Sequence, residues 1–268
     1  MTETATRALT GAAYVALTLG AALAGPLTTT LLFLPVSLLA AREMHRLSHA
    51  TKEETPPVTI PLLVTAATFL TIAFLGTGLL SLRSSAVVLL AAFTVGVVDI
   101  VLNNAKEPVR GVGTLLIMIA YIAMPFGLIT SLLTDGPHLF IGFMIILWTN
   151  DTGAYLVGRA IGRTKLMPRV SPKKTVEGFG GGLVLAMMAG VVLALAWPDL
   201  TLAQWVICAA VVAVTSTIGD LLESSFKREA GVKDSGHVLP GHGGILDRFD
   251  GFLLALPAML ACAKLMGA

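Results

Sequence analysis

Long apolar segments are the feature that most constrains this chain. Nine of them, each of helix length, occupy residues 9–24, 27–41, 60–80, 86–102, 114–133, 139–157, 180–196, 202–222 and 245–265. A transmembrane helix needs about 20 apolar residues, whereas a transmembrane β-strand needs about 10 residues of alternating polarity. Only 13% of the residues are charged, against about 25% in soluble domains. The sequence therefore predicts an all-α, polytopic integral membrane protein with about nine transmembrane or re-entrant helices.

The first two segments differ from the others in how they are joined. Gly25-Pro26 predicts a tight turn between them. The second segment, 27–41, is short for a full crossing. We therefore expect these two segments to form a tilted or partly re-entrant hairpin.

Lysine and arginine are distributed unevenly between the loops. With the N-terminus in the cytoplasm, fifteen of the eighteen fall on the cytoplasmic side and two on the opposite side. Such an excess is typical of cytoplasmic loops. The predicted location is the inner (cytoplasmic) membrane, crossed several times, with the N-terminus and the active site facing the cytoplasm. A net charge of +2 is too small to indicate nucleic acid as a partner.

Charged side chains concentrate in one stretch, residues 219–251, which holds six carboxylates, four cations and two histidines. Asp220 and Glu223 lie three residues apart, as do Asp247 and Asp250, so each pair shares one face of a helix. A glycine-rich turn, 240–244, separates the two pairs. This pattern favours a cradle for a divalent cation and phosphates. We accordingly divide the chain into N-terminal membrane helices, 1–135, and catalytic membrane helices with cytoplasmic loops, 136–268.

Two further motifs precede this stretch. Asn150 and Asp151 lie in the stretch 148–155, which closes the sixth apolar segment. Polar side chains at that depth are costly and usually functional; alternatively they only cap or pair at the water boundary. A second group, made of lysines, hydroxyls and a carboxylate, stands before a glycine-rich helix start and includes Ser171, Lys173, Lys174, Thr175 and Glu177. Such a combination can hold phosphate, although a basic loop beside anionic lipid fits it equally well.

Together these motifs resemble the phosphatidate cytidylyltransferase family, also called CDP-diacylglycerol synthases. The C-terminal signature of that family is matched by Ser224, Lys227, Arg228, Lys233, Asp234, Leu239, Pro240, His242, Gly243, Gly244, Asp247, Arg248 and Asp250. The two upstream motifs also resemble those of the family, so the similarity spans about residues 140–255. The N-terminal half is similar only in being several apolar helices.

The resemblance implies an enzyme that uses CTP and phosphatidic acid in the lipid bilayer, with Mg²⁺ as cofactor. A second cation and a homodimer are left open. We expect Asp220, Glu223, Asp247 and Asp250 as metal ligands, and Asp220, Asp247, Asp250, Lys227 and Arg248 as catalytic residues. The expected substrate-binding residues are Asn150, Asp151, Ser171, Lys173, Lys174, Thr175, Glu177, Lys227, Arg228, Lys233, His242, Gly243 and Gly244.

Three other functions remain compatible with parts of the pattern. An ion-coupled transporter would also carry intramembrane carboxylates, but usually in broken helices of two related halves. A lipid-binding scaffold would need the basic loops but not four acidic side chains at helical spacing. A cytidylyltransferase with another phospholipid acceptor would share the metal and nucleotide site, and it is therefore the strongest alternative.

Overall fold

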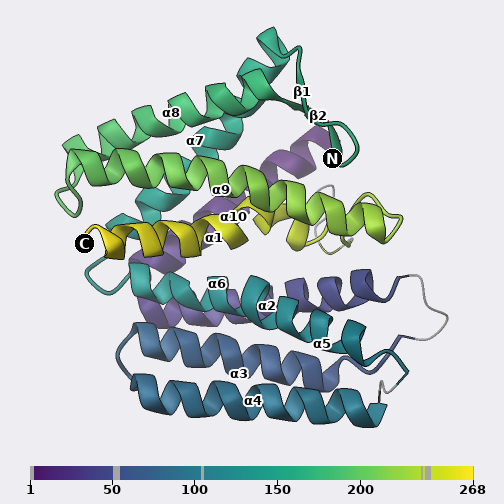
Figure 1. Cartoon of the computed structure of the whole chain (residues 1–268). Coiled ribbons are helices and arrows are strands. Elements are labelled where there is room, and N and C mark those ends of the chain that lie inside the picture. The colour runs from purple at the N-terminus through teal and green to yellow at the C-terminus, as the bar shows by residue number, and fades with distance from the viewer. Residues whose placement is uncertain (1–2, 51–54, 104–105, 237, 239–242, 268) are drawn as a thin grey trace. The chain divides into compact units, whose positions relative to one another are not determined.

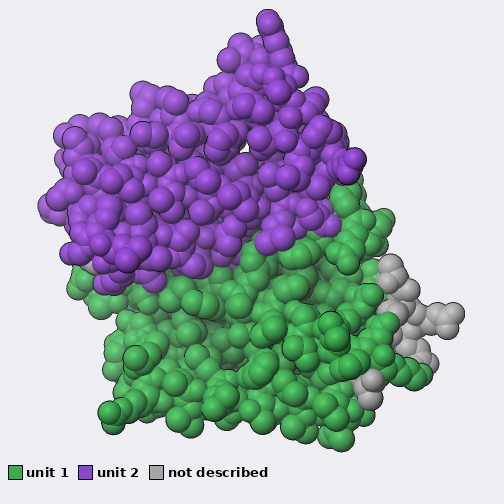
Figure 2. All heavy atoms as spheres, in the orientation of Figure 1, with its two compact units in different colours: residues 1–135, 226–248 green, residues 136–225, 249–268 purple. Residues whose placement is uncertain are grey.

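The computed structural model describes residues 3–50, 55–103, 106–236, 238 and 243–267 (Figure 1). These residues form two compact units, shown in different colours in Figure 2. Unit 1 consists of Met1–Asp135 and Phe226–Arg248, and unit 2 of Gly136–Ser225 and Phe249–Ala268. Residues 226–248 lie in the half predicted to be catalytic, yet they belong to the unit that contains the N-terminal helices.

Unit 1 is helical in its described N-terminal part. Its elements are α1 (Glu3–Ala24), α2 (Pro26–Ser48), α3 (Thr59–Gly76), α4 (Leu82–Asn103), α5 (Pro108–Leu116), a π-helical segment η1 (Ile117–Ala123), α6 (Met124–Leu128) and a 3₁₀ turn η2 (Ile129–Leu132). The predicted turn between α1 and α2 is confirmed, because Gly25 has a φ of 107° and Pro26 is the first residue of α2. Glycine adopts this positive φ without the steric cost that other residues incur.

The unit 1 helices pack through aliphatic and aromatic side chains. Val64 of α3, Ile100 of α4 and Leu115 of α5 form a buried cluster, and α3 and α4 lie side by side in Figure 1. The rings of Phe33 and Phe126 stack with their centroids 5.7 Å apart. These contacts join α3 to α4 and α5, and α2 to α6.

Helix α2 is longer than the sequence indicated. The apolar segment ends at residue 41, but the helix continues to Ser48. Glu43, Met44 and His45 in this extension are all buried. The expectation that the second segment is too short to cross a membrane is therefore wrong, because hydropathy alone does not show where polar residues find partners inside a fold.

Unit 2 contains α7 (His138–Ile161), a hairpin of β1 (Lys165–Met167) and β2 (Ser171–Thr175), α8 (Val176–Ala196), most of α9 (Leu202–Glu229) and most of α10 (Leu246–Leu265). The two strands are antiparallel, and Lys165 faces Thr175. Phe143 of α7 meets Phe252 of α10 edge to face, with ring centroids 5.4 Å apart. The hairpin lies between the predicted apolar segments 139–157 and 180–196.

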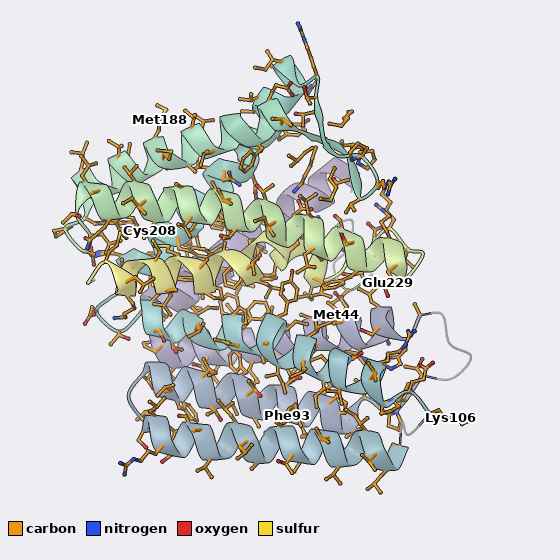
Figure 3. The ribbon with its side chains drawn as sticks, in the orientation of Figure 1. Met44, Phe93, Lys106, Met188, Cys208 and Glu229 are labelled. Atoms are coloured by element: carbon orange, nitrogen blue, oxygen red, sulfur yellow. The ribbon has the colours of Figure 1, made fainter. Side chains whose placement is uncertain are left out.

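The outward faces of the unit 2 helices are apolar. Figure 3 shows Met188 pointing away from α8, where it is 58% exposed, whereas Cys208 of α9 is buried. Exposed methionine, leucine and valine side chains on a helix are expected where the surrounding medium is lipid. This face would be an aggregation risk in water.

The predicted all-α membrane fold is confirmed. In the described part of the chain, seven helices are long and apolar enough to cross a membrane: Pro26–Ser48, Thr59–Gly76, Leu82–Asn103, Pro108–Leu132, His138–Ile161, Val176–Ala196 and Leu202–Glu229. The other two predicted segments are also helical, but the apolar part of α1, Thr10–Ala24, is shorter. Helix α10 carries Asp247, Arg248 and Asp250 at its start.

Candidate functional site

Four carboxylates of unit 2 form what we call the acidic cluster: Asp151 of α7, Asp220 and Glu223 of α9, and Asp250 of α10. Asp250 interacts electrostatically with the other three. Glu223 is fully buried, and the side chain of Asp220 is 32% exposed. The structure thus brings together one carboxylate from an upstream motif and three from the C-terminal stretch.

Two glycines explain how α9 and α10 come close enough to form this cluster. A Cβ atom on Gly219 would lie 2.5 Å from the carbonyl oxygen of Asp250, and one on Gly251 would lie 3.1 Å from Cβ of Ser216. Any larger side chain at Gly219 would push the helices apart. Because Gly219 precedes Asp220 and Gly251 follows Asp250, the close approach occurs where the carboxylates lie.

Asp220 pairs with a lysine and a serine of unit 2. Lys174 of strand β2 forms an ion pair with its Oδ2 atom, and the hydroxyl of Ser224 donates a hydrogen bond to its Oδ1 atom at 3.3 Å. Both side chains of the ion pair remain about 30% exposed (28% and 32%). The pairing places one predicted phosphate-binding lysine beside one predicted metal ligand.

Asn150 supports the cluster from α7. Its side chain is 2% exposed, and Nδ2 donates to the hydroxyl of Ser216 at 3.1 Å. The same nitrogen lies 3.4 Å from Oδ1 of Asp151. Asn150 therefore links α7 to α9 beside Asp151, which is itself exposed.

The second upstream motif divides into residues with internal partners and residues that face outward. Thr175 caps α8 by accepting a hydrogen bond from the N–H group of Gly178 at 3.1 Å. Glu177 accepts hydrogen bonds from the backbone N–H groups of Arg163 and Thr164. Lys173 is exposed on β2 and Ser171 is half-buried. The substrate-binding assignments of all four residues stay predictions, but two of them have structural partners.

The glycines that begin α8 serve helix packing. A Cβ atom on Gly178 would lie 2.8 Å from the carbonyl oxygen of Ala154, and one on Gly182 would lie 2.8 Å from that of Asn150. The backbone of α8 therefore lies directly against α7. This close packing holds Asn150 and Asp151 in register with the start of α8.

Asp247 in unit 1 has a different environment. Lys227 donates to its Oδ1 atom at 2.6 Å. Its Oδ2 atom accepts hydrogen bonds from the N–H group of Gly244 at 2.8 Å, and from the N–H and hydroxyl groups of Ser235 at 2.9 and 3.0 Å. Four donors therefore surround one carboxylate whose side chain is only 10% exposed. Charge-assisted hydrogen bonds of this kind favour the ionised form.

Gly243 has a backbone conformation that suits the same turn. Its φ is 80°, and a Cβ atom there would lie 2.6 Å from Oδ2 of Asp247. Both the conformation and the space therefore require glycine. His242, which was predicted to bind substrate, lies outside the described residues.

The remaining predicted cations lie at the surface. Arg228, Lys233 and Arg248 are exposed, and Arg228 donates from Nη1 to the carbonyl oxygen of Val232 at 2.9 Å. Their assignment to phosphate contacts stays a prediction.

Sequence reasoning missed Glu43 of α2, which is 2% exposed and hydrogen-bonds Ser235, Ile245 and Leu246. It follows the apolar segment 27–41 and belongs to none of the motifs described above. One signal could have identified it: Glu43 stands among helix-forming, partly apolar residues. Burial of a carboxylate in such a helix is costly unless specific donors surround it.

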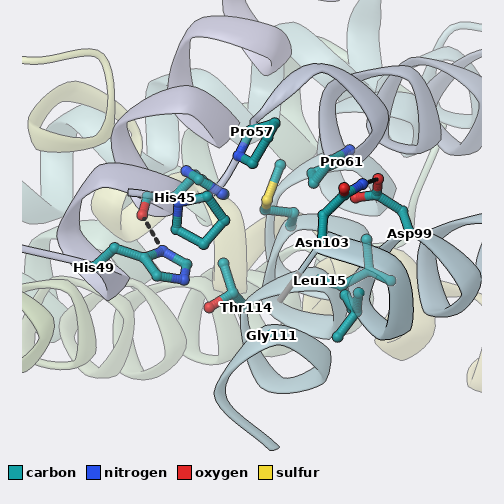
Figure 4. Close-up of a pocket in the computed structure, with 12 residues that line it drawn as sticks. His45, His49, Pro57, Pro61, Asp99, Asn103, Gly111, Thr114 and Leu115 are labelled. Carbon is teal, nitrogen blue, oxygen red and sulfur yellow. Dashed lines mark hydrogen bonds between the residues drawn. The ribbon is translucent and has the colours of Figure 1, made fainter. Parts of the chain in front are cut away.

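A small pocket in unit 1 is lined by two histidines of α2 and its C-terminal end. His45 and His49 line it together with Asp99 and Thr114 (Figure 4). Nδ1 of His49 lies 2.8 Å from the carbonyl oxygen of His45. Asp99 accepts a hydrogen bond from Asn103 at 2.7 Å. The volume of about 20 Å³ suits a single water, so this pocket does not fit a nucleotide.

Comparison with known proteins assigns the chain to a family. Residues 5–266 match the family model described as the cytidylyltransferase family. The chain belongs to this family. The resemblance predicted from the C-terminal signature is therefore confirmed, and the match extends into the N-terminal half, where the sequence had shown only apolar helices.

Curated relatives in the cytidylyltransferase family carry a more specific name. A phosphatidate cytidylyltransferase of Staphylococcus saprophyticus is 44% identical over 146 residues, which is 54% of this chain and 56% of that protein. Proteins of the same name from Staphylococcus haemolyticus and Staphylococcus aureus are 43% and 42% identical over the same length. The matched region thus covers about half of each of these relatives.

The acidic cluster offers the carboxylate oxygens that a hard cation such as Mg²⁺ prefers, but these oxygens do not converge on one point. Among the described residues, no three His, Cys, Asp or Glu side chains converge closely enough to hold a metal ion. Magnesium commonly binds one or two protein carboxylates and keeps several waters. The cluster contains four carboxylates, and three of them interact electrostatically with the fourth, Asp250. Lys174 is the lysine that pairs with the cluster. Acidic groups therefore outnumber this basic group. A divalent cation at this cluster would therefore take one or two of these carboxylates and complete its coordination with water.

Proposed function

We propose that this protein transfers the cytidylyl group of CTP to phosphatidic acid, giving CDP-diacylglycerol and pyrophosphate. Family membership and the name of the relatives support the reaction class. The observation that carries the proposal is the acidic cluster with Lys174 beside Asp220, inside a helical membrane protein. A polar nucleotide needs these charges, and a lipid acceptor needs a site that it can reach from the membrane.

The acceptor brings its own nucleophile to this reaction. A phosphate monoester has a second pKa near 6, by analogy with other phosphomonoesters, so it is largely a dianion at pH 7. One of its oxygens forms a bond to the α-phosphorus of CTP, the bond between that phosphorus and the α,β-bridging oxygen breaks, and pyrophosphate leaves with the electron pair. Because no proton must be removed from a dianion, positioning and charge neutralisation are the main tasks of the protein.

Carboxylates position two of the lysines proposed to neutralise phosphate charge. Lys174 is paired with Asp220, and Lys227 with Asp247. Each pairing restricts a flexible side chain to one position, and a lysine ammonium group carries three N–H donors. Arg228 and Arg248, which are exposed, are proposed to contact phosphates of the nucleotide.

A bound Mg²⁺ would neutralise phosphate charge and polarise the reacting phosphoryl group. Asp220 and Asp250 are the proposed ligands from the acidic cluster, with Glu223 beside them. Asp247 was predicted as a fourth ligand, and that role stays a prediction because its oxygens already accept four hydrogen bonds.

An apolar groove on unit 2 suits the lipid part of the acceptor. It is open to the outside, has a volume of about 290 Å³, and is lined by Ile145, Trp148, Thr149, Thr152, Gly153 and Leu185. Trp148, Thr149 and Thr152 flank Asn150 and Asp151 in the sequence of α7. We propose that an acyl chain lies here while its phosphate approaches the acidic cluster.

The proposed orientation places the β1–β2 hairpin and the residues that follow α9 on the cytoplasmic side of the inner membrane. Lys165 and Lys233 are exposed, so single cysteines at these positions report the side directly. We expect both to react with a membrane-impermeant thiol reagent only from the cytoplasmic face. Labelling only from the opposite face would overturn the orientation.

The decisive experiment measures incorporation of radiolabelled CTP by the purified full chain in detergent micelles. Phosphatidic acid is expected to be the preferred acceptor when compared at equal concentration with other phospholipids that carry a free phosphate or hydroxyl group. Labelled CDP-diacylglycerol and equimolar pyrophosphate are the expected products. Preference for another acceptor would instead support the related lipid cytidylyltransferase, and no transfer to any lipid would overturn the proposal.

A further inference from the structure

Glu43 lies in the N-terminal helices, far in sequence from every motif that suggested a function. It belongs to α2, and its side chain is only 2% exposed. A buried carboxylate is tolerated only where donors replace the water that it has lost. Glu43 therefore requires specific hydrogen-bond donors inside unit 1.

The first two partners are backbone groups at the start of α10. The N–H group of Ile245 donates to Oε1 of Glu43 at 3.0 Å, and that of Leu246 donates to Oε2 at 2.9 Å. The first N–H groups of a helix have no partner within the helix itself. Glu43 thus caps α10 from another helix, and its negative charge lies at the positive end of the helix dipole.

The third partner connects Glu43 to Asp247. The hydroxyl oxygen of Ser235 lies 2.9 Å from Oε2 of Glu43 and 3.0 Å from Oδ2 of Asp247. Its single proton is therefore shared between the two carboxylates. Ser235 also donates its backbone N–H group to Asp247, so its main chain and side chain both contribute to the link.

Two glycines, Gly236 and Gly244, leave room for the Glu43 carboxylate. A Cβ atom on Gly236 would lie 2.5 Å from Oε1 of Glu43, and one on Gly244 would lie 2.5 Å from Oε2. Gly244 is the last residue of the glycine-rich turn 240–244, and Gly236 lies four residues before that turn. The need for small residues there follows at least partly from a side chain of the N-terminal helices.

We propose that Glu43 is a positioning residue that holds Ser235 and the start of α10 so that Asp247 meets Lys227 in one fixed geometry. Glu43 does not contact the reacting atoms in this proposal. It acts through Ser235, Ile245 and Leu246. The kinetic part of the proposal rests on the proposed function, whereas the geometric part does not.

The kinetic test uses Glu43→Gln, which keeps the shape but removes the charge and one acceptor oxygen. Loss of a group that orients a metal or phosphate ligand typically costs 10–100-fold, so we expect kcat to fall by about that factor. KM for CTP should change by less than about threefold, since no substrate contact is lost. Glu107→Gln is the matched control, because Glu107 is a partly exposed carboxylate of the same unit, paired with Arg110.

A purely structural role is separated from positioning by two further measurements. If Glu43 only stabilised the fold, activity would return at temperatures well below the unfolding transition of the variant. If the link through Ser235 matters, Ser235→Ala should also lower kcat, and the double variant should lose little more than the more damaged single variant. Normal kcat in folded Glu43→Gln, or fully additive losses, would overturn positioning.

The geometric test does not depend on enzymatic activity. Hydrogen exchange of the amides of Ser235, Gly244, Ile245 and Leu246 should accelerate at least tenfold in Glu43→Gln and remain unchanged in Glu107→Gln. Unchanged exchange would overturn the capping role whatever the reaction is. If exchange accelerates but the wild type transfers no cytidylyl group to any lipid, the proposed function fails and the capping role stands.

Discussion

The two groups of carboxylates in this protein differ in what surrounds them. Asp247 in unit 1 accepts four hydrogen bonds from Lys227, Ser235 and Gly244. In the acidic cluster of unit 2, by contrast, Asp250 accepts one backbone hydrogen bond, from the N–H group of Gly251 at 2.7 Å, and is repelled by the carboxylates of Asp151, Asp220 and Glu223. One group is satisfied by the protein itself, and the other carries repelling charges.

This difference indicates two roles for side chains of the same chemical type. Like charges held close together destabilise a fold unless a cation or proton neutralises them. A carboxylate with four donors instead stabilises the turn that provides them. We therefore expect the acidic cluster to matter for the reaction at the expense of stability, and Asp247 to matter for both the reaction and stability.

The largest effect is expected from Asp250→Asn. Loss of a metal ligand at a phosphoryl-transfer site removes much of the charge stabilisation, and kcat should fall by more than about 10³-fold. The melting temperature without added magnesium should stay the same or rise, because one repelling charge is gone. Transfer kinetics and thermal unfolding of the same preparation test both points. Glu229→Gln, an exposed acid at the end of α9, is the control, and a marked loss of stability in Asp250→Asn would contradict this assignment.

Asp247→Asn should combine a large loss of activity with a loss of stability. An asparagine cannot accept hydrogen bonds on both sides, so either Lys227 or the N–H groups of Ser235 and Gly244 face an amide NH₂. A buried donor without its partner costs about 1–3 kcal/mol. We expect turnover to fall about 10²-fold or more and the melting temperature to drop, while the variant still folds. Near-normal magnesium-dependent turnover would remove Asp247 from the site.

Comparison of these two variants also shows what the sequence could and could not predict. The helices were predictable because their apolar segments are long and continuous, and hydropathy is a property of neighbouring residues. Asp220, Glu223, Asp247 and Asp250 were identifiable because helical spacing is local as well. Their different environments were not predictable, since they depend on residues from other helices and from the β2 strand.

Glu43 and Lys174 illustrate this limit. Glu43 reaches Ser235, which is 192 residues away in the sequence, and no spacing rule relates them. Lys174 was predicted to bind phosphate, but its pairing with Asp220 depends on a hairpin of three- and five-residue strands. Strands this short and polar carry almost no sequence signal.

Two adjacent lysines offer a smaller test of the acidic cluster. Lys174 pairs with Asp220, whereas Lys173 is exposed on the same strand. Removing the positive charge beside Asp220 should increase repulsion within the cluster and weaken phosphate binding. We expect Lys174→Ala to lower kcat/KM for CTP by about tenfold, equivalent to about 1.4 kcal/mol, and Lys173→Ala to lower it less. Equal losses in the two variants would mean that the ion pair has no special role.

The smallest effect is expected from replacing His242. In the alternative mechanism, this histidine would act as a general base and remove a proton from the lipid phosphate. General base catalysis is typically worth about 10²–10⁴-fold. If phosphatidic acid attacks as its own dianion, His242→Gln should lower kcat less than either aspartate variant does. The wild-type rate should rise with pH through about 6 to 7, because the acceptor phosphate loses its second proton there. The same rise should persist in His242→Gln, since the titrating group belongs to the lipid. A pH profile that becomes flat in this variant would instead identify the histidine as the titrating group, and the site would then need a base that neither group of carboxylates supplies.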